Sequence, residues 1–340
     1  GFASYLEGLS REDLLRLVRD MAERRPQVRE ELEDRKAVSQ GKTGALVRSV
    51  RLKIREAAAE PGWRNRWDRY GDFPDYSGVQ SGLAALLEAG CADEVLGLAE
   101  ELLDAATLQV EESYDEGDMG LEVAGCAAVV AKALERSPRQ VAGKILWVLD
   151  MLDRDSHDLF FPLKRFLERS HAKKHWGEAA DVLLKRLGAL KPSRPGDEWQ
   201  SGRERERLSD TVILALENAG RHDEIIPLCE REAKITGSWD RLVKRLTEAG
   251  RLDEAEAAVF EGLKAAEGKR GGSEWALRAL LLQIRAKTGD RRGEASLRVD
   301  DFLRRPSLGG YGECRKATRP GSLWPRVRQG LMRFLESGDF

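Results

Sequence analysis

A short internal repeat is the feature that most constrains how this chain of 340 residues can fold. Residues 86–95, 216–225 and 246–255 share the pattern Leu-x-x-Ala-Gly-x-x-Asp-Glu, a weaker copy spans 286–295, and 175–179 carries part of it. Glycine takes the left-handed conformation that ends many helices, and aspartate is a common N-cap. Each copy therefore predicts a helix, a tight turn and an antiparallel helix. The turn glycines are Gly90, Gly220, Gly250 and Gly289, and the predicted caps are Asp93, Asp223 and Asp253.

The spacing of these turns indicates the fold class. The glycines at 220, 250 and 289 lie 30 and 39 residues apart, which is typical of helical-hairpin repeats. One hairpin cannot bury its apolar face alone, so several must stack. The repeats are similar to tetratricopeptide and HEAT repeats, with irregular spacing. The predicted fold is all-α, an α-solenoid of antiparallel helical hairpins with one concave surface, in which Ala255, Ala257 and Ala258 let helices approach closely.

Helical signals continue outside the repeats. Ser10 followed by Asp13 resembles a capping box, and Pro26 starts or kinks the segment that follows. No segment shows the sustained alternation of a strand, so we predict none. A third helix is predicted from about residue 43 to 59, with an apolar face of Leu46, Val47, Val50 and Ile54.

Stretches rich in loop-forming residues divide the chain. Glycine and proline at 60–78, 191–202 and 305–325 predict breaks, and 111–120 predicts an acidic loop. The predicted organisation is an N-terminal helical segment (1–60), a linker (61–78), helical hairpins with the acidic loop (79–190), a second linker (191–202), tetratricopeptide-like repeats (203–304) and a basic C-terminal segment with a terminal helix (305–340).

Charge is unevenly distributed along the chain. The composition, 41% hydrophobic and 34% charged, excludes a disordered chain, and no run approaches the roughly 18 to 20 apolar residues of a membrane helix. Residues 71–136 hold 15 acidic and 2 basic side chains, whereas 264–333 hold 17 basic and 7 acidic ones. An acidic block followed by a basic end gives a hint about partners and none about the fold.

The first residues of the chain give a hint about processing, and the cysteines give one about the cellular compartment. The chain opens Gly1-Phe2 without an initiator methionine or a signal peptide, so we expect a fragment, a processed chain or a tag scar. Four cysteines without a CxxC pair indicate reduced thiols in a cytoplasmic protein rather than a cysteine-based zinc site. They are Cys91, Cys126, Cys229 and Cys314.

Three runs carry a resemblance to a known family. They are residues 9–18 followed by Pro26 and Leu32, residues 76–79 leading into 83–95, and the acidic stretch at 114–117. From Leu9 to about residue 135 the chain resembles the region that follows the finger in bacterial SWIM zinc finger proteins. The resemblance implies the C-terminal helical part of a larger protein, whose finger is thought to contact DNA or protein. The CxC…CxH ligand set of that finger is absent from this chain, so no zinc ligand carries over.

Candidate reaction centres are few. His171 and His175 are four apart on a predicted helix and could share a metal, but a HExxH protease motif would need glutamate where Ala172 stands. The acidic residues of 111–118 lack the spacing of a calcium loop. The glycines of 268–272 and 309–312 lack the context of a phosphate loop and are predicted to form flexible turns. We therefore predict no enzyme activity, no cofactor and no metal.

Basic and aromatic residues are interleaved in two places. One set is Arg48, Arg51, Lys53, Arg55, Trp63, Arg64, Arg66, Trp67 and Arg69. The other is Arg304, Arg305, Arg315, Lys316, Arg319, Arg326 and Arg328. Arginine beside aromatic rings suits phosphate contact and base stacking. In the alternative interpretation, the tryptophans pack the linker, the arginines are solvated, and the basic end pairs with the acidic block or binds a protein.

The sequence thus predicts a non-catalytic helical-repeat scaffold that binds a protein or peptide, as the C-terminal part of a larger SWIM-type zinc finger protein. Solenoids present extended binding surfaces, and no reaction centre is evident. The alternative is a nucleic-acid-associated module whose basic ends contact phosphates. No membrane partner is predicted.

We expect the purified chain to bind no zinc stoichiometrically. A helix pair of histidines offers two ligands, whereas structural zinc takes four and catalytic zinc usually three from the protein. Elemental analysis of tag-free, dialysed protein measures this. About one zinc per chain would contradict the prediction, and His171→Ala would then show whether the histidine pair holds the ion.

Overall fold

A computed structural model describes residues 1–41, 43–59, 63–64, 71–72, 74–113, 119–190, 198–267, 273–319 and 323–338. In these residues the fold is all-α as predicted, with 18 α-helices that pack against their neighbours. The prediction of no strand is wrong at one place, where β1 (Trp63–Arg64) pairs antiparallel with β2 (Gly71–Asp72). Strands of two residues are too short to produce an alternating pattern. The described residues contain no larger sheet.

The chain divides into two compact units, Gly1–Ala179 and Ala180–Phe340. The predicted domain boundaries stay predictions. The first unit contains α1 (Phe2–Glu7), α2 (Arg11–Arg24), α3 (Pro26–Ser39), α4 (Thr43–Ala57), α5 (Ser77–Glu88), α6 (Ala92–Glu112), α7 (Met119–Arg136), α8 (Val141–Arg154), the 3-10 helix η1 (Phe161–Leu163) and α9 (Lys164–Glu168). The second contains α11 (Glu198–Ala219), the 3-10 helix η2 (His222–Glu224), α12 (Ile225–Thr236), α13 (Trp239–Glu248), α14 (Leu252–Ala266), α15 (Ser273–Thr288), α16 (Arg291–Arg304), α17 (Leu308–Thr318) and α18 (Trp324–Ser337), and α10 (Lys173–Ala189) crosses the division.

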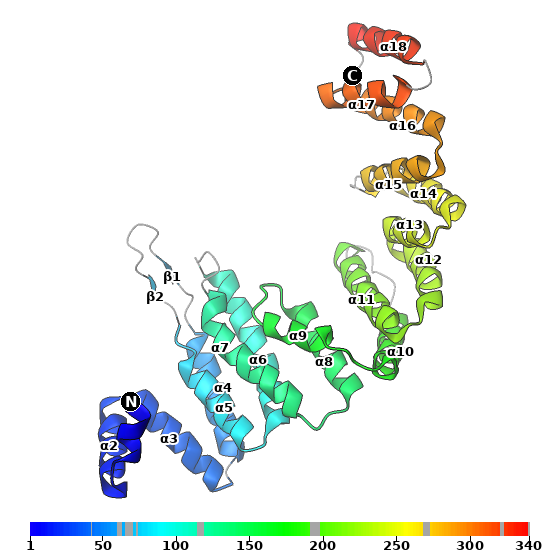
Figure 1. Ribbon diagram of the computed structural model, residues 1–340. Helices are drawn as coiled ribbons and strands as arrows, with labels where there is room; N and C mark the ends of the chain where they lie inside the picture. The colour runs from blue at the N-terminus through cyan, green and yellow to red at the C-terminus, as the bar shows by residue number, and fades with distance from the viewer. Residues whose placement is uncertain are drawn as a thin grey trace. The chain divides into compact units, whose positions relative to one another are not determined.

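Helices α4 to α8 and η1 contribute the core of the first unit (Figure 1). The apolar face predicted for the third helix is confirmed, because Leu46, Val50 and Ile54 are buried against α5 and α6. The predicted cap of α2 is also confirmed, since the Ser10 hydroxyl accepts a hydrogen bond from the Asp13 amide at 3.1 Å. Burial of a continuous apolar surface is the main term that stabilises such a unit.

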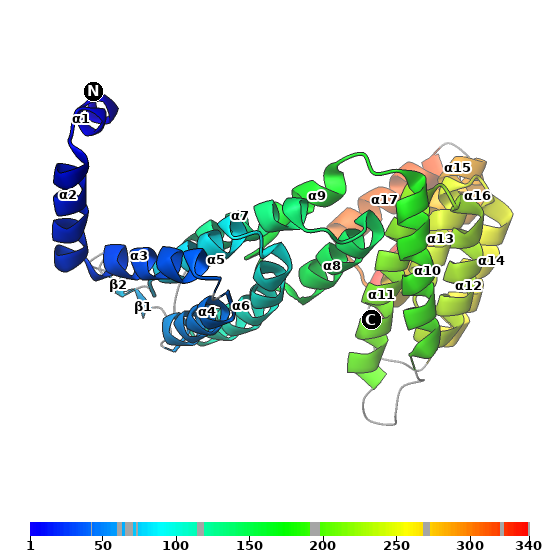
Figure 2. The same cartoon turned by 90° about the horizontal axis from the view of Figure 1, so that it is seen from below.

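In the second unit, successive hairpins place alternate helices in two layers. Helices α11, α13 and α15 lie on one side and α12, α14 and α16 on the other (Figure 2). Gly262 marks a close approach within this packing, because a Cβ atom there would lie 2.7 Å from the Trp239 Cβ and 2.8 Å from the Leu277 Cδ1. Ala255 and Ala258 are buried as predicted, whereas Ala257 is exposed, since it lies on the opposite side of α14.

The four turn glycines adopt the predicted left-handed conformation, with φ between +72° and +80°. At each of these glycines the helix ends with the same pair of backbone hydrogen bonds. At Gly250, for example, the glycine amide donates to Thr247 O at 3.3 Å, and the Arg251 amide donates to Leu246 O at 2.9 Å. This pairing is the Schellman motif, which satisfies carbonyl groups that a helix end otherwise leaves open.

The predicted aspartate caps are wrong. Helix α14 starts at Leu252 with Arg251 as its N-cap residue, so Asp253 lies inside the first turn and caps nothing. Asp223 lies within η2, and Asp93 lies in the first turn of α6. The turn is shorter than the sequence suggested, because the residue after the glycine is already the N-cap. Only in the weak copy does an aspartate cap its helix, with Asp290 accepting from the Gly293 amide at 2.9 Å.

Three predicted breaks are shorter than expected. Helix α5 begins at Ser77 and α11 at Glu198, inside the two predicted linkers. The predicted turn at 309–312 is part of α17, whose first turn is capped by Ser307 through the Gly310 amide. Burial of Cys314 and Thr318 compensates for the low helix propensity of its glycines. Most of the predicted acidic loop lies outside the described residues, and its ends are helical.

The finer prediction of a superhelical solenoid with one concave surface stays a prediction. Within the described ranges, every helix is too short or too polar to cross a membrane.

Gly250→Ala should lower the free energy of unfolding by about 1 kcal/mol or more, because alanine is strained at a φ of +74°. Urea denaturation followed by circular dichroism measures the change. Gly97→Ala is the matched control, since Gly97 lies exposed inside α6 with nothing near its missing Cβ. It should stabilise the protein by about 0.5 to 1 kcal/mol. Equal effects of the two substitutions would contradict the assigned turn.

Candidate functional site

Arginine–carboxylate pairs between helices are the main polar feature of the first unit. Arg51 of α4 binds Glu101 of α6 through two bonds of 2.6 and 2.5 Å, and this contact lowers the pKa of Glu101. Asp93 accepts from Arg139, and Asp104 from Arg154. The acidic block predicted at 71–136 is therefore partly neutralised by arginines from outside the block.

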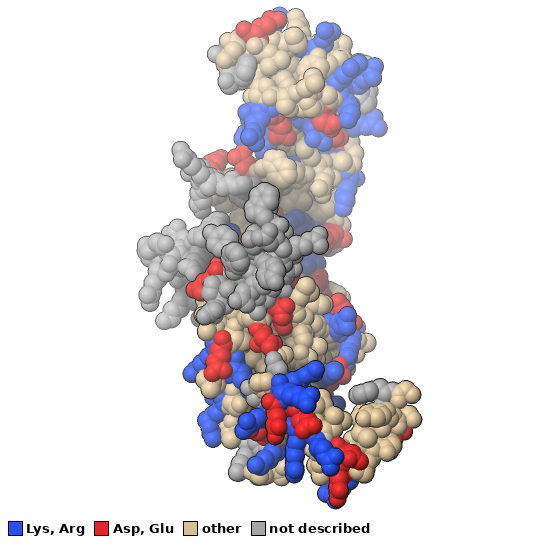
Figure 3. All heavy atoms as spheres, turned by 90° about the vertical axis from the view of Figure 1, so that its left-hand side faces the viewer, with Lys and Arg blue, Asp and Glu red and all other residues tan. Residues whose placement is uncertain are grey.

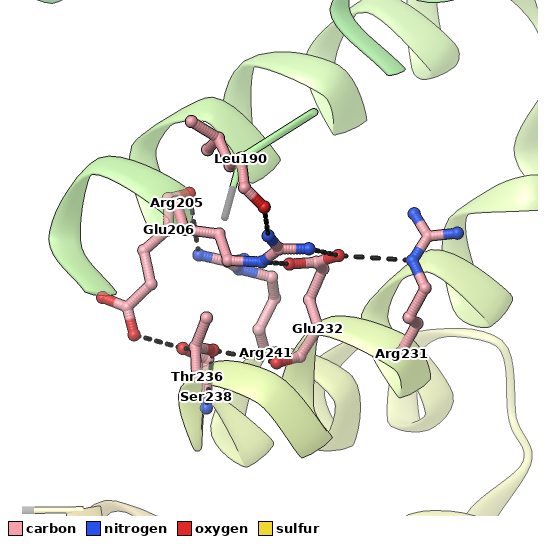
Figure 4. A network of polar contacts seen from close by, with 8 residues as sticks. All are labelled: Leu190, Arg205, Glu206, Arg231, Glu232, Thr236, Ser238 and Arg241. Carbon is pink, nitrogen blue, oxygen red and sulfur yellow. Dashed lines mark hydrogen bonds and ion pairs between the residues drawn. The ribbon is translucent and has the colours of Figure 1, made fainter. Parts of the chain in front are cut away.

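The second unit holds a buried pair of the same kind, shown in Figure 4. The Glu232 side chain is 1% exposed and accepts from Arg205 Nε at 2.6 Å and Nη2 at 3.0 Å. Arg205 also donates to the Leu190 carbonyl, and Arg231 approaches the same carboxylate at 3.3 Å. The network ties α11 to α12 and to the end of α10. A buried carboxylate needs such partners because its desolvation is costly.

The first basic and aromatic set is only partly assembled. Arg51 and Lys53 bind Glu101 and Asp34, whereas Arg48 and Arg55 are exposed on α4. The charge of Arg55 also helps to lower the pKa of Glu101. The backbone of Trp63 and Arg64 forms β1. The remaining members of the set, Arg66, Trp67 and Arg69, lie outside the described residues.

The second basic set is spread over α16, α17 and α18. Arg304 pairs with Glu274 at 2.5 Å and with Asp300, and Lys316 pairs with Glu313 at 2.8 Å. Figure 3 shows Lys and Arg close to Asp and Glu on the face drawn there. The other members are exposed, and they are Arg305, Arg315, Arg319, Arg326 and Arg328.

The two histidines engage separate partners. His171 Nε2 lies 2.6 Å from the Phe166 carbonyl oxygen, and its ring stacks against Phe166. His175 Nδ1 lies 3.7 Å from Glu178 and has no hydrogen-bond partner among the described residues. Across the residues that the structure describes, no three His, Cys, Asp or Glu side chains gather as a metal site would require.

The four cysteines are free thiols. Burial raises the pKa of Cys126 to about 12 and that of Cys229 to about 11. A thiol with such a pKa is protonated at neutral pH and is a poor nucleophile.

An open cavity of about 470 Å³ lies between α15 and α16. Its lining residues are Glu274, Trp275, Arg278, Ala279, Leu282, Arg298, Asp301, Arg304 and Arg305. Trp275 is 76% exposed, which is unusual for the largest apolar side chain. The cavity volume falls in the range of ligand pockets in proteins.

The sequence prediction included Arg304 and Arg305 but missed Trp275 and the rest of the cavity. One signal was present, because Trp275 falls outside the buried stripe of α15 formed by Leu277, Leu281 and Ile284. A tryptophan off the apolar stripe of a helix is a candidate contact residue.

Comparison with known proteins adds no identification. No protein-family model matches the chain, and a search of curated proteins finds no match.

Arg205→Met should lower the free energy of unfolding by about 3 kcal/mol, because it leaves the Glu232 carboxylate buried without its main partner. The double variant Arg205→Met, Glu232→Met should recover most of that loss. Arg251→Met is the control, since its pair with Glu254 is exposed and should shift the urea midpoint little. A double variant as unstable as the single one would contradict this account.

Proposed function

We propose that the chain is a non-catalytic helical-repeat scaffold that binds a protein or peptide partner. The single observation that carries the proposal is the cavity at α15 and α16 with its exposed Trp275. Tryptophan and arginine are the residues that contribute most often to binding energy at protein interfaces. Here both types line one cavity on the rigid surface of two packed helices.

The repeat architecture supports the same proposal. Stacked hairpins with the same glycine turn present rows of side chains that a partner chain can follow. A solenoid with a concave face, and membership of a larger SWIM-type zinc finger protein, are parts of this proposal that rest on the sequence pattern.

A nucleic-acid-associated module is the second candidate. The observation that favours it is the group of exposed arginines on α17 and α18, among them Arg315, Arg326 and Arg328. Binding of this kind depends on release of counterions and falls steeply with salt. Interleaved carboxylates such as Glu313 weaken an electrostatic surface for phosphates, so this candidate ranks second.

Trp275→Ala should abolish capture of the cellular partner. The tag-free wild-type chain, immobilised and exposed to lysate of the source organism, should retain a specific protein that mass spectrometry identifies. Phe260→Ala is the control, because Phe260 is 50% exposed on α14 and does not line the cavity. Capture that is unchanged by Trp275→Ala, or a retained species that nuclease treatment removes, would contradict the proposal.

A further inference from the structure

Two of the four arginines in the α15–α16 cavity are held in ion pairs with carboxylates of α15 and α16. Arg278 donates to Asp300 at 2.5 Å and to Asp301 at 2.7 Å. Arg304 donates to Glu274 at 2.5 Å and to Asp300 at 3.2 Å. The pairs of Arg278 and the Arg304–Glu274 pair join α15 to α16, while Asp300 holds Arg304 within α16. Both guanidinium groups are therefore fixed and form walls of the cavity.

The other two arginines have hydrogen-bond donors without a partner in the described part of the chain. Arg298 lines the cavity, and its Nε is buried without a hydrogen-bond partner among the described residues. Its only ion pair in that part of the chain is a 3.5 Å approach of Nη2 to Glu313. Arg305 is exposed at the end of α16, with no carboxylate within pairing distance in the described ranges. A guanidinium carries five N–H donors, and a carboxylate satisfies two of them at once.

An apolar surface lies beside these donors. The exposed indole of Trp275 is joined by Ala279 and Leu282, one and two turns further along α15. Such a surface buries an aliphatic or aromatic side chain, and an indole contributes a large contact area at low entropic cost. The cavity thus combines a place for one anion with a place for an apolar group.

The charges of the residues that line the cavity limit how much negative charge a bound anion can carry. The four arginines that line the cavity are matched by four carboxylates, Glu274 and Asp301 in the lining and Asp300 and Glu313 beside it, so no large positive excess is left for an anion. A single carboxylate adds only one negative charge to this balanced set. A phosphate dianion or a nucleic-acid backbone would bring additional negative charge close to Glu274 and Asp301, which repel it.

We infer that this cavity binds an aspartate or glutamate side chain of a partner peptide, with an apolar neighbour of that residue packed on Trp275. The inference rests on the proposed peptide-binding function and adds the chemistry of the partner. Arg298 and Arg305 provide the hydrogen bonds to the carboxylate, while Arg278 and Arg304 keep the two helices in register.

Fluorescence anisotropy of the whole chain with short labelled peptides tests the inference. One peptide pool carries glutamate at a central position flanked by Phe, Leu or Trp, and the matched pool carries glutamine there. The glutamate pool should bind about tenfold more tightly or better, because a hydrogen bond to a charged group contributes more than a neutral one. Arg298→Gln, Arg305→Gln and Trp275→Ala should each remove most of this binding.

Arg292→Gln is the matched control, since Arg292 is exposed on α16, carries the same charge and does not line the cavity. It should leave the affinity unchanged. Arg305→Gln changes an exposed side chain and so tests the site even if Arg298→Gln fails to fold.

Several results would overturn the inference. These are equal binding of the two pools, tighter binding of a phosphoserine pool or a single-stranded oligonucleotide, and no binding of any pool. Equal binding that Trp275→Ala abolishes leaves the proposed function standing and removes only the preference for an acidic residue. The proposed function fails separately, when partner capture from lysate is independent of Trp275.

Discussion

Each repeated hairpin depends on the left-handed glycine that ends its first helix. At Gly90, Gly220, Gly250 and Gly289 the chain reverses within about two residues, and two backbone bonds satisfy the last open carbonyls. The next helix must then run antiparallel beside the first. Since the two helices share an apolar face that neither can cover alone, further hairpins pack on them. Any side chain larger than hydrogen is strained at these positions, so the turn residue fixes the architecture.

Arginine–carboxylate pairs give the packed helices their register. The chain contains 57 basic and 59 acidic residues, and many of them meet between helices, as Arg51 and Glu101 do in the first unit and Arg205 and Glu232 in the second. Exposed pairs add little stability, but the buried Glu232 is strongly dependent on its partner. These pairs also decide which arginines stay open toward a ligand. Arg298 and Arg305 are important because these pairs leave some of their donors unsatisfied.

The same pairing limits what the basic C-terminal end can bind. Glu274, Asp301 and Glu313 lie among its arginines, so a polyanion meets more repulsion than a single carboxylate does. The binding mode that we infer therefore favours a peptide with one acidic residue beside an apolar one over a phosphate backbone. This preference depends on how positive and negative side chains alternate within about one helical turn. The net charge of a long segment does not reveal that local balance.

The sequence by itself determined the helical class and the positions of the hairpin turns. Those properties depend on local physics, because the 3.6-residue period and the left-handed glycine act over a few neighbouring residues. The predicted aspartate caps were wrong, since a difference of two residues in where the helix begins moves Asp253 from the cap into the first turn. Nor did the sequence predict α17, whose glycines lie in a helix that Ser307 caps and that buries Cys314 and Thr318.

Only the tertiary structure decided which charges stay open. Arg278 and Asp301 are 23 residues apart in sequence, and Arg304 and Glu274 are 30 apart. Their pairing depends on how α15 packs against α16, and a periodic pattern describes one helix at a time. The cavity beside Trp275 is likewise a property of two helices together, so no single segment of the sequence could reveal it.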